Sequence, residues 1–262
     1  MKPPMAGSSS NDTRSYFESA ASPLHALVFL APMLIFYEVS VVASQFGEPG
    51  SVRGVEAHRI FSELFGGFGV VGGRLPAVAL VLTMLVMHVR RRDRWRVRPG
   101  VLVGMGIESV ALTLPLLMLN AVVGSMRRAP GASDVAAAGV PTTPDLSSLP
   151  WLDQLTISVG AGLYEEFLFR LVLLASFTTL LAGAAGMQRA GGRGVAIALS
   201  AIAFAWYHEA AAGVAGVDWY LFVFYAIAGV YFSLVYLWRG FGVAAGVHGM
   251  YDIIVLVLLP RW

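Results

Sequence analysis

Apolar stretches long enough to cross a lipid bilayer constrain this chain more than any other feature of its sequence. A helix needs roughly 20 apolar residues to span a hydrocarbon core of ~30 Å, because lipid offers backbone N–H and C=O groups no hydrogen-bond partner. Such stretches lie at about 24–44, 74–90, 101–123, 152–182, 194–212, 218–238 and 241–259. The mean hydropathy of +0.70 is also well above that of a soluble domain. The sequence therefore predicts an all-α, polytopic membrane bundle of about seven transmembrane helices.

The rest of the composition sets the domain organisation and excludes several function classes. Residues 1–22 are small and polar, which predicts a flexible N-terminal tail, and residues 23–262 then form a single membrane domain. The chain has no cysteine, which excludes disulfides, zinc–thiolate sites and thiol nucleophiles. A net charge of +2 is too small to indicate a nucleic-acid partner.

Arginine placement predicts how the chain is oriented in the membrane. Basic residues concentrate in short cytoplasmic loops, and the strongest cluster here is RRRDRWRVR at 90–98. With that cluster in the cytoplasm, the N-terminus is cytoplasmic as well. Lys2 is the only lysine among 18 basic residues, a bias that points to GC-rich coding and hence to a bacterium. We therefore expect a multi-pass protein of a bacterial inner (cytoplasmic) membrane.

Ionisable residues inside the predicted spans are the next constraint. A charge at the bilayer centre costs roughly 2.5–3.5 kcal/mol on insertion scales, so each such residue is a functional candidate. The spans contain Glu38, Glu108, Glu165, Glu166, Arg170, His208, His248 and Asp252. Glu38 and Glu108 belong to no motif, and we interpret them as interhelical hydrogen-bond partners, with a proton path or a cavity lining as the alternative.

Helical geometry separates the three charges of YEEFLFR at 164–170. At ~100° per residue, Glu166 and Arg170 lie about 40° apart on one face and can neutralise each other. Glu165 and Arg170 are about 140° apart, so Glu165 is left as an unpaired carboxylate. The small residues at 160–162 would let another helix approach closely.

Two further pairs share a helix face in the same way. In FAWYH, Phe204 and His208 are four residues apart, and in HGMYD so are His248 and Asp252. The helical rise of ~1.5 Å per residue places Glu165, His208 and His248 within roughly 10 Å of one depth in the membrane. The three side chains can therefore belong to one site.

A carboxylate and two imidazoles at one depth suit the hydrolysis of a peptide bond. Glu165 could act as a general base on a water molecule. His208 and His248 could orient that water, protonate a leaving amine or donate to an oxyanion, and Asp252 could hold the histidine tautomer or bind the tetrahedral intermediate. Neither HExxH nor GxSxG occurs, so zincin and serine-hydrolase chemistry have no motif here.

These residues resemble the motifs of the CAAX prenyl protease and bacteriocin-processing family (CPBP, also called ABI), which are glutamic-type intramembrane endopeptidases. The family has a Glu-Glu-x3-Arg motif, an aromatic residue and a histidine separated by three residues, and a histidine followed four residues later by Asn or Asp. They are matched here by Glu165, Glu166 and Arg170, by Phe204 and His208, and by His248 and Asp252. The resemblance covers a core at about 150–260 and leaves the first 150 residues unspecified.

The resemblance implies a role for each matched residue. Glu165 would activate water, and Glu166, Arg170 and Phe204 would be supporting residues. The two histidines and Asp252 would serve the transition state. Asp252 stands where the eukaryotic prenyl proteases have Asn, and an ionised carboxylate would repel an oxyanion, so Asp252 is either protonated or orients His248 instead.

The resemblance also implies the reaction partners. The substrate would be a membrane-anchored or lipidated protein or peptide in the lipid bilayer, cut in a C-terminal tail, a sorting signal or a leader. We expect no cofactor, although two histidines and two carboxylates are a reasonable ligand set for a divalent metal. The alternative function is a proton-coupled transporter or channel that uses the buried carboxylates, but the sequence shows no inverted repeat or pair of broken helices.

Overall fold

The computed structural model describes residues 16–44, 75–127, 149–183, 189–212 and 217–259, and these ranges contain helices and no strands. The α-helices are α2 (Pro23–Ser44), α4 (Leu75–Arg91), α5 (Pro99–Arg127), α7 (Trp151–Gly160), α8 (Ala175–Gly183), α9 (Arg189–Ala212), α10 (Trp219–Arg239) and α11 (Phe241–Asp252). Three π-helical segments extend them: η3 (Ala161–Glu165), η4 (Phe167–Leu174) and η5 (Ile253–Leu258).

All seven apolar stretches are helical, and five of the described helices are long and apolar enough to cross a membrane. These five are Pro23–Ala43, Pro99–Met126, Trp151–Gly183, Trp219–Arg239 and Phe241–Leu258. Helix α4 has 17 residues, which at ~1.5 Å per residue is shorter than a ~30 Å core. Helix α9 begins with two arginines and three glycines in RAGGRG, which lower its hydropathy. The helical membrane bundle is thus confirmed, whereas the count of seven spans stays a prediction.

The segment before α2 is partly ordered, although the sequence predicts a flexible tail up to residue 22. Residues 16–20 are helical and Ala20 is fully buried. The Tyr16 hydroxyl donates to the Glu108 carboxylate on α5 at 2.8 Å. The ordered domain therefore begins before Pro23, because this aromatic side chain has an acceptor inside the bundle. Residues 1–15 of the predicted tail lie outside the described ranges.

Helix α11 is the centre of the bundle. Its residues from Phe241 to Gly249 are all buried, and it contacts α2, α5, α7, η3 and α10. A Cβ at Gly162 of η3 would lie 2.6 Å from the backbone nitrogen of Gly249 and 2.8 Å from the carbonyl oxygen of Ala245. Only glycine lets these two backbones touch, as expected for the small residues at 160–162. The close approach sets His248 of α11 beside Glu165.

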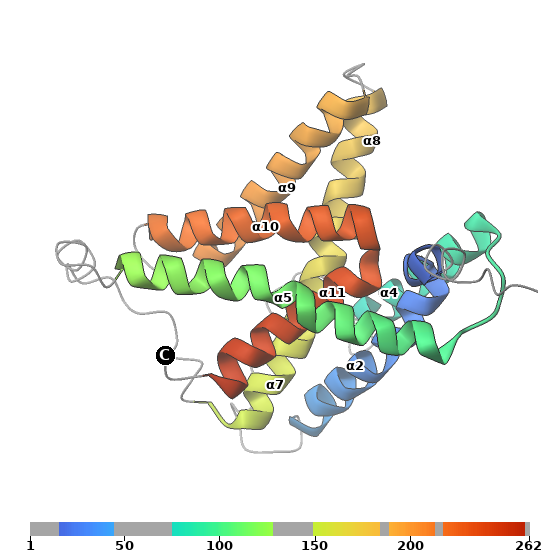
Figure 1. Cartoon of the computed structure of the whole chain (residues 1–262), viewed down its shortest axis with the longest axis horizontal. Coiled ribbons are helices and arrows are strands. Elements are labelled where there is room, and N and C mark those ends of the chain that lie inside the picture. Colours follow the sequence, from blue (N-terminus) through green and yellow to red (C-terminus); the bar gives the residue numbers. More distant parts are fainter. Residues whose placement is uncertain (1–15, 45–74, 128–148, 184–188, 213–216, 260–262) are drawn as a thin grey trace, which may run out of the picture.

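The remaining helices frame this centre (Figure 1). The run from α7 through η3 and η4 to α8 is one long helical element, and α8 and α9 form a hairpin that projects from the bundle. Helices α10 and α11 are joined by the single residue Gly240, whose φ of 85° favours glycine. This tight turn lets α10 pack against α11. Helix α10 also contacts α9 and α5.

The outer surface of α5 is the kind that lipid covers. Val103, Ile107, Val110, Leu114 and Met118 recur every three or four residues and are exposed, Met118 to 70%. A contiguous apolar stripe of this kind would be unfavourable in water and is ordinary against acyl chains. The acidic residue of this helix, Glu108, instead forms an ion pair with Arg239 of α10.

Candidate active site

Glu166 and Arg170 form the buried ion pair that helical phase predicts. The guanidinium Nε lies 3.1 Å from Glu166 Oε2, and both side chains are 0% exposed. The two residues flank the start of η4, and π-helical segments such as η3 and η4 are frequent at functional sites. Mutual neutralisation makes the two charges tolerable at this depth.

Arg170 is also held by groups from other helices. Its Nη2 donates to the carbonyl oxygen of Gly229 on α10 at 3.2 Å. The guanidinium carbon lies 4.8 Å from the ring centre of Phe204 and 5.2 Å from that of Phe232. Both separations suit cation–π contacts. Phe204, predicted as a support residue, therefore packs on the arginine as well as on its own histidine.

A hydrogen bond to Glu166 orients the imidazole of His248. The Nδ1 atom lies 2.9 Å from Glu166 Oε1 inside the bundle, so Nδ1 carries a proton and donates to the carboxylate. The ring of Phe232 stacks on the imidazole at 4.5 Å between centroids. With Nδ1 committed, the Nε2 atom faces Glu165 Oε2 at 3.8 Å and Asp252 Oδ2 at 3.6 Å.

His208 is oriented by a backbone carbonyl instead. Its Nδ1 lies 2.9 Å from the oxygen of Phe204, one turn earlier on α9, which fixes Nδ1 as the donor. The Phe204 ring lies 4.4 Å away, and Tyr225 of α10 stacks on the other side at 3.9 Å. The Nε2 atom of His208 then faces Glu165 Oε2 at 3.5 Å.

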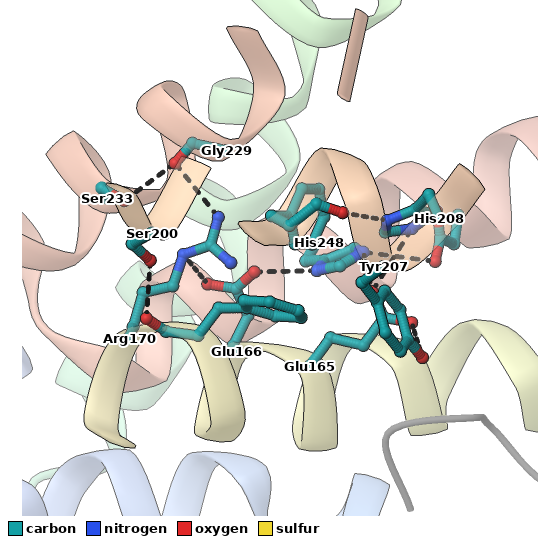
Figure 2. A network of polar contacts seen from close by, with 12 residues as sticks. Glu165, Glu166, Arg170, Ser200, Tyr207, His208, Gly229, Ser233 and His248 are labelled. Carbon is teal, nitrogen blue, oxygen red and sulfur yellow. Dashed lines mark hydrogen bonds and ion pairs between the residues drawn. The ribbon is translucent and has the colours of Figure 1, made fainter. Parts of the chain in front are cut away.

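Glu165 is the point at which these contacts converge (Figure 2). Its Oε1 accepts a hydrogen bond from the Tyr207 hydroxyl at 3.2 Å. Its Oε2 is buried and has no hydrogen-bond partner among the described residues, although the Nε2 atoms of His208 and His248 both point to it. No arginine in the described ranges forms an ion pair with Glu165, as expected from the helical phase that pairs Arg170 with Glu166. A buried carboxylate oxygen without a hydrogen-bond partner, between two imidazole nitrogens, could accept a proton from a water molecule.

Asp252 lies one turn after His248, as predicted, and its side chain is 19% exposed. It faces Nε2 of His248, while the tautomer of that ring is fixed through Nδ1 by Glu166. Of the roles that the sequence leaves open, holding the tautomer therefore falls to Glu166. Asp252 lies instead on the face of the imidazole that looks toward Glu165.

Glu38 and Glu108 lie outside this cluster and are confirmed as interhelical hydrogen-bond partners. Glu38 of α2 accepts from the Tyr164 hydroxyl at 2.6 Å. Glu108 of α5 accepts from Tyr16 and forms an ion pair with Arg239 of α10, whose Nη2 lies 2.7 Å from Oε2. Both carboxylates therefore have partners that satisfy them.

Three site residues escape the sequence motifs: Tyr207, Tyr225 and Phe232. Tyr207 directly precedes His208, and only the structure shows its hydroxyl on Glu165. Tyr225 and Phe232 are seven residues apart on α10, within the aromatic-rich stretch YLFVFYAIAGVYFSLVYLW. Their spacing puts them on one face, and that periodicity was the available signal. The described residues contain no group of three or more His, Asp or Glu side chains that could hold a metal ion.

Comparison with known proteins gives one match. Residues 147–254 match the family model of the type II CAAX prenyl endopeptidase Rce1-like family. No curated protein and no solved structure matches the chain significantly. The matched range contains all seven residues that the motifs single out, and it agrees with the resemblance to the CPBP proteases. The match over residues 147–254 therefore shows similarity to the Rce1-like family and indicates an intramembrane protease of the CAAX type.

Proposed function

We propose that the protein is an intramembrane endopeptidase that hydrolyses a peptide bond of a membrane-associated substrate with a water molecule activated by Glu165. The observation that carries this proposal is the buried Oε2 of Glu165, which has no hydrogen-bond partner among the described residues and faces two imidazole nitrogens. A general base needs such an accepting atom within reach of the proton that it removes.

In the first step, water is held between Glu165 and His208. Because Nδ1 of His208 donates to the Phe204 carbonyl, the neutral ring presents a lone pair on Nε2. One hydrogen atom of this water molecule points to Oε2 of Glu165, and its second hydrogen atom points to Nε2 of His208. The oxygen lone pair is then free to attack the substrate carbonyl carbon while Glu165 takes the first proton.

The second step collapses the tetrahedral intermediate. As an imidazolium, His248 donates from Nδ1 to Glu166 and from Nε2 to the oxyanion, and the carboxylates around it balance its charge. A protonated Asp252 would add a second donor at the same place. The proton on Glu165 passes to the leaving nitrogen, the C–N bond breaks, and Glu165 returns to its ionised form.

The substrate is a membrane-anchored or lipidated peptide cut in a C-terminal tail, a sorting signal or a leader. Support comes from the family match and from the place of the cluster inside a bundle of candidate membrane spans, where a segment anchored in the bilayer can reach it. Apart from the substrate and a water molecule, the proposed steps involve side chains of this chain alone.

The test is cleavage by the purified protein in liposomes. Membrane proteins from cells with and without the protein are compared by mass spectrometry of their termini, and a peptide from the altered protein becomes the reporter. Glu165→Gln should abolish cleavage, by at least about 100-fold, while the protein stays folded and inserted. The matched control is Glu108→Gln, a carboxylate-to-amide change outside the cluster, which should retain cleavage per folded molecule. Full activity in Glu165→Gln would remove the mechanism.

The same preparations address the transporter alternative. A proton-coupled carrier would show pH-driven flux that depends on Glu38 or Glu108 as much as on Glu165. Glu38 accepts a hydrogen bond from Tyr164, and Glu108 accepts one from Arg239. These contacts favour a structural role for both carboxylates. Flux that survives Glu165→Gln and fails in Glu38→Gln would support the carrier instead.

The proposed location is a bacterial inner membrane with the N-terminus in the cytoplasm. The arginine cluster at 90–98 supports this orientation through the positive-inside rule. Because the chain has no cysteine, a single Ser10→Cys change gives a clean reporter. A membrane-impermeant maleimide should label it in inverted vesicles and leave it unlabelled in intact spheroplasts; the reverse pattern would invert the topology.

A further inference from the structure

The connection between α4 and α5 carries the densest charge of the molecule. Six of the nine residues at 90–98 are arginines, and Asp93 is the single acidic residue among them. All six arginines are exposed. None of them belongs to the candidate active site, so this surface needs an explanation of its own.

The side chains of most of these arginines have no partner among the residues that the structure describes. Arg91 lies 3.2 Å from Asp93 and donates to the Ala21 carbonyl, and Arg98 bonds to Ser19. The side chains of the other four form no ion pair or hydrogen bond with any described residue: Arg90, Arg92, Arg94 and Arg96. Four exposed cations that the described part of the chain leaves unneutralised attract an anionic partner.

The turn that presents these cations has a fixed shape. Arg92 has a φ of 55°, in the left-handed region that residues other than glycine rarely adopt, and its N–H donates to the Val89 carbonyl at 3.1 Å. The chain thus turns sharply after α4 and runs to Pro99, where α5 begins. A residue in an unfavourable backbone conformation persists only where its surroundings hold it.

The cluster lies at the level of lipid headgroups. It directly precedes α5, one of the five candidate spans, so it sits where that span leaves the hydrocarbon. Trp95 within it is 64% exposed, with its ring edge on the buried His88 at 4.3 Å. An exposed tryptophan among arginines beside a span is typical of the membrane–water interface.

An apolar cavity of about 240 Å³ adjoins this turn, between the ends of α2, α4, α10 and α11. Arg91 is its charged lining residue, and Met84, Met87, Trp238 and Phe241 are among its apolar ones. A phosphate beside Arg91 and part of an acyl chain in the cavity would satisfy both kinds of lining. Arginine suits such a phosphate because its planar fork can donate two parallel hydrogen bonds.

We propose that the α4–α5 turn and this cavity form a binding site for an anionic phospholipid. The phosphate lies among the arginines at 90–96, and the first part of an acyl chain enters the cavity. A nucleic acid or an acidic peptide would satisfy the charges and leave the cavity and the interfacial Trp95 unexplained. The arginines could instead serve only to orient the protein in the membrane by the positive-inside rule. That role would need the charges, but it would explain neither the ordered turn nor the cavity.

The test is native mass spectrometry of the protein released from nanodiscs that contain equal amounts of phosphatidylglycerol and phosphatidylcholine. The wild-type protein should retain phosphatidylglycerol in at least about tenfold excess, given the attraction of several arginines to anionic lipid. Arg91→Gln should lower the excess several-fold, and it leaves five arginines to maintain the topology. Changing Arg90, Arg92, Arg94 and Arg96 together to Gln should abolish it. The matched control, Arg193→Gln on an exposed part of α9, should change nothing.

Three outcomes would overturn the proposal. The wild-type protein could release both lipids in the bulk ratio, or the fourfold variant could keep the excess. Inorganic phosphate at millimolar concentration could also displace the lipid, which would indicate a simple anion site. Glu165→Gln should bind phosphatidylglycerol as the wild type does, so this result is independent of the proposed peptidase activity.

Discussion

The described helices bury two carboxylate–arginine pairs, and one of these two lies in the candidate active site. Glu166 and Arg170 sit on neighbouring turns of one helical element and are both 0% exposed. Glu108 and Arg239 join α5 to α10, and the Glu108 side chain is 17% exposed. Both pairs carry opposite charges in lipid, so a pair by itself does not identify a catalytic site.

The difference lies in what surrounds each pair. Beside Glu166 stand His248 and a second carboxylate, Glu165, with an oxygen that no described residue satisfies. Beside Glu108 stands the Tyr16 hydroxyl, and the guanidinium of Arg239 lies 4.3 Å from the ring centre of Phe17. The second pair therefore fastens the segment before α2 to the bundle. Chemistry follows from the unpaired group beside an ion pair rather than from the pair itself.

Removing the arginine from the first pair should have the largest effect. Arg170→Met leaves Glu166 as an uncompensated charge inside the bundle, which costs roughly 3–5 kcal/mol of unfolding free energy. Cleavage should be lost as well, because His248 depends on Glu166 for its orientation. Thermal unfolding in detergent and the reporter assay measure the two effects.

The double change Glu166→Gln with Arg170→Met is the control for that prediction. It removes both charges, so it should recover much of the stability lost in Arg170→Met. If Arg170→Met unfolds at the wild-type temperature, the pair is not needed to compensate a buried charge and the comparison fails.

Removing the arginine from the second pair should cost less. Arg239→Met should lower the unfolding free energy by about 1–3 kcal/mol, because Glu108 keeps some access to water and the hydroxyl of Tyr16. The cleavage rate per folded molecule should stay within about twofold of the wild type, since the pair touches no site residue. A large loss of rate with unchanged stability would instead connect Glu108 and Arg239 to catalysis.

The sequence predicts the first pair and the helices that carry both pairs. Helical periodicity and apolar stretch length, which underlie these predictions, act between residues close in the sequence. The 3.6-residue period is enough to pair Glu166 with Arg170 and to separate Glu165 from them. The same period places Phe204 beside His208 and Asp252 beside His248. The apolar stretches likewise predict the helices, because in lipid a helix satisfies its backbone N–H and C=O groups within its own segment.

The rest depends on how helices pack, which no local period encodes. Nothing in the sequence indicates that Arg239, at the end of α10, meets Glu108, or that Tyr16 joins them from the segment taken as a flexible tail. Tyr207 is missed for the same reason, since its contact with Glu165 crosses from α9 to η3. The π-helical turns that carry Glu165 also have no signature in propensity.

In each carboxylate cluster a tyrosine hydroxyl donates to a glutamate, which allows a finer comparison. Tyr207→Phe removes the hydrogen bond to Glu165 and should lower kcat by about tenfold, with little change in KM or in thermal stability. Its role is to position the carboxylate, so the split between kcat and KM is the informative readout. A variant that loses stability and keeps its kcat would show that Tyr207 acts only in packing.

Tyr16→Phe is the matched change at the other cluster and should have the smallest effect. At neutral pH it removes one hydrogen bond to Glu108 and should cost about 0.5–1.5 kcal/mol of stability, with no change in kcat. Burial, and then the hydrogen bond and charge of Glu108, raise the pKa of Tyr16 to about 12, compared with ~10 for an unfolded tyrosine. The stabilisation by Tyr16 is therefore complete below pH ~10 and lost as the pH rises toward about 12, because the unfolded chain ionises first. The thermal midpoints of the wild type and Tyr16→Phe should therefore differ at pH 8 and become more similar at pH 11.5. An equal difference between the two proteins at both pH values would show that the phenol does not ionise against Glu108.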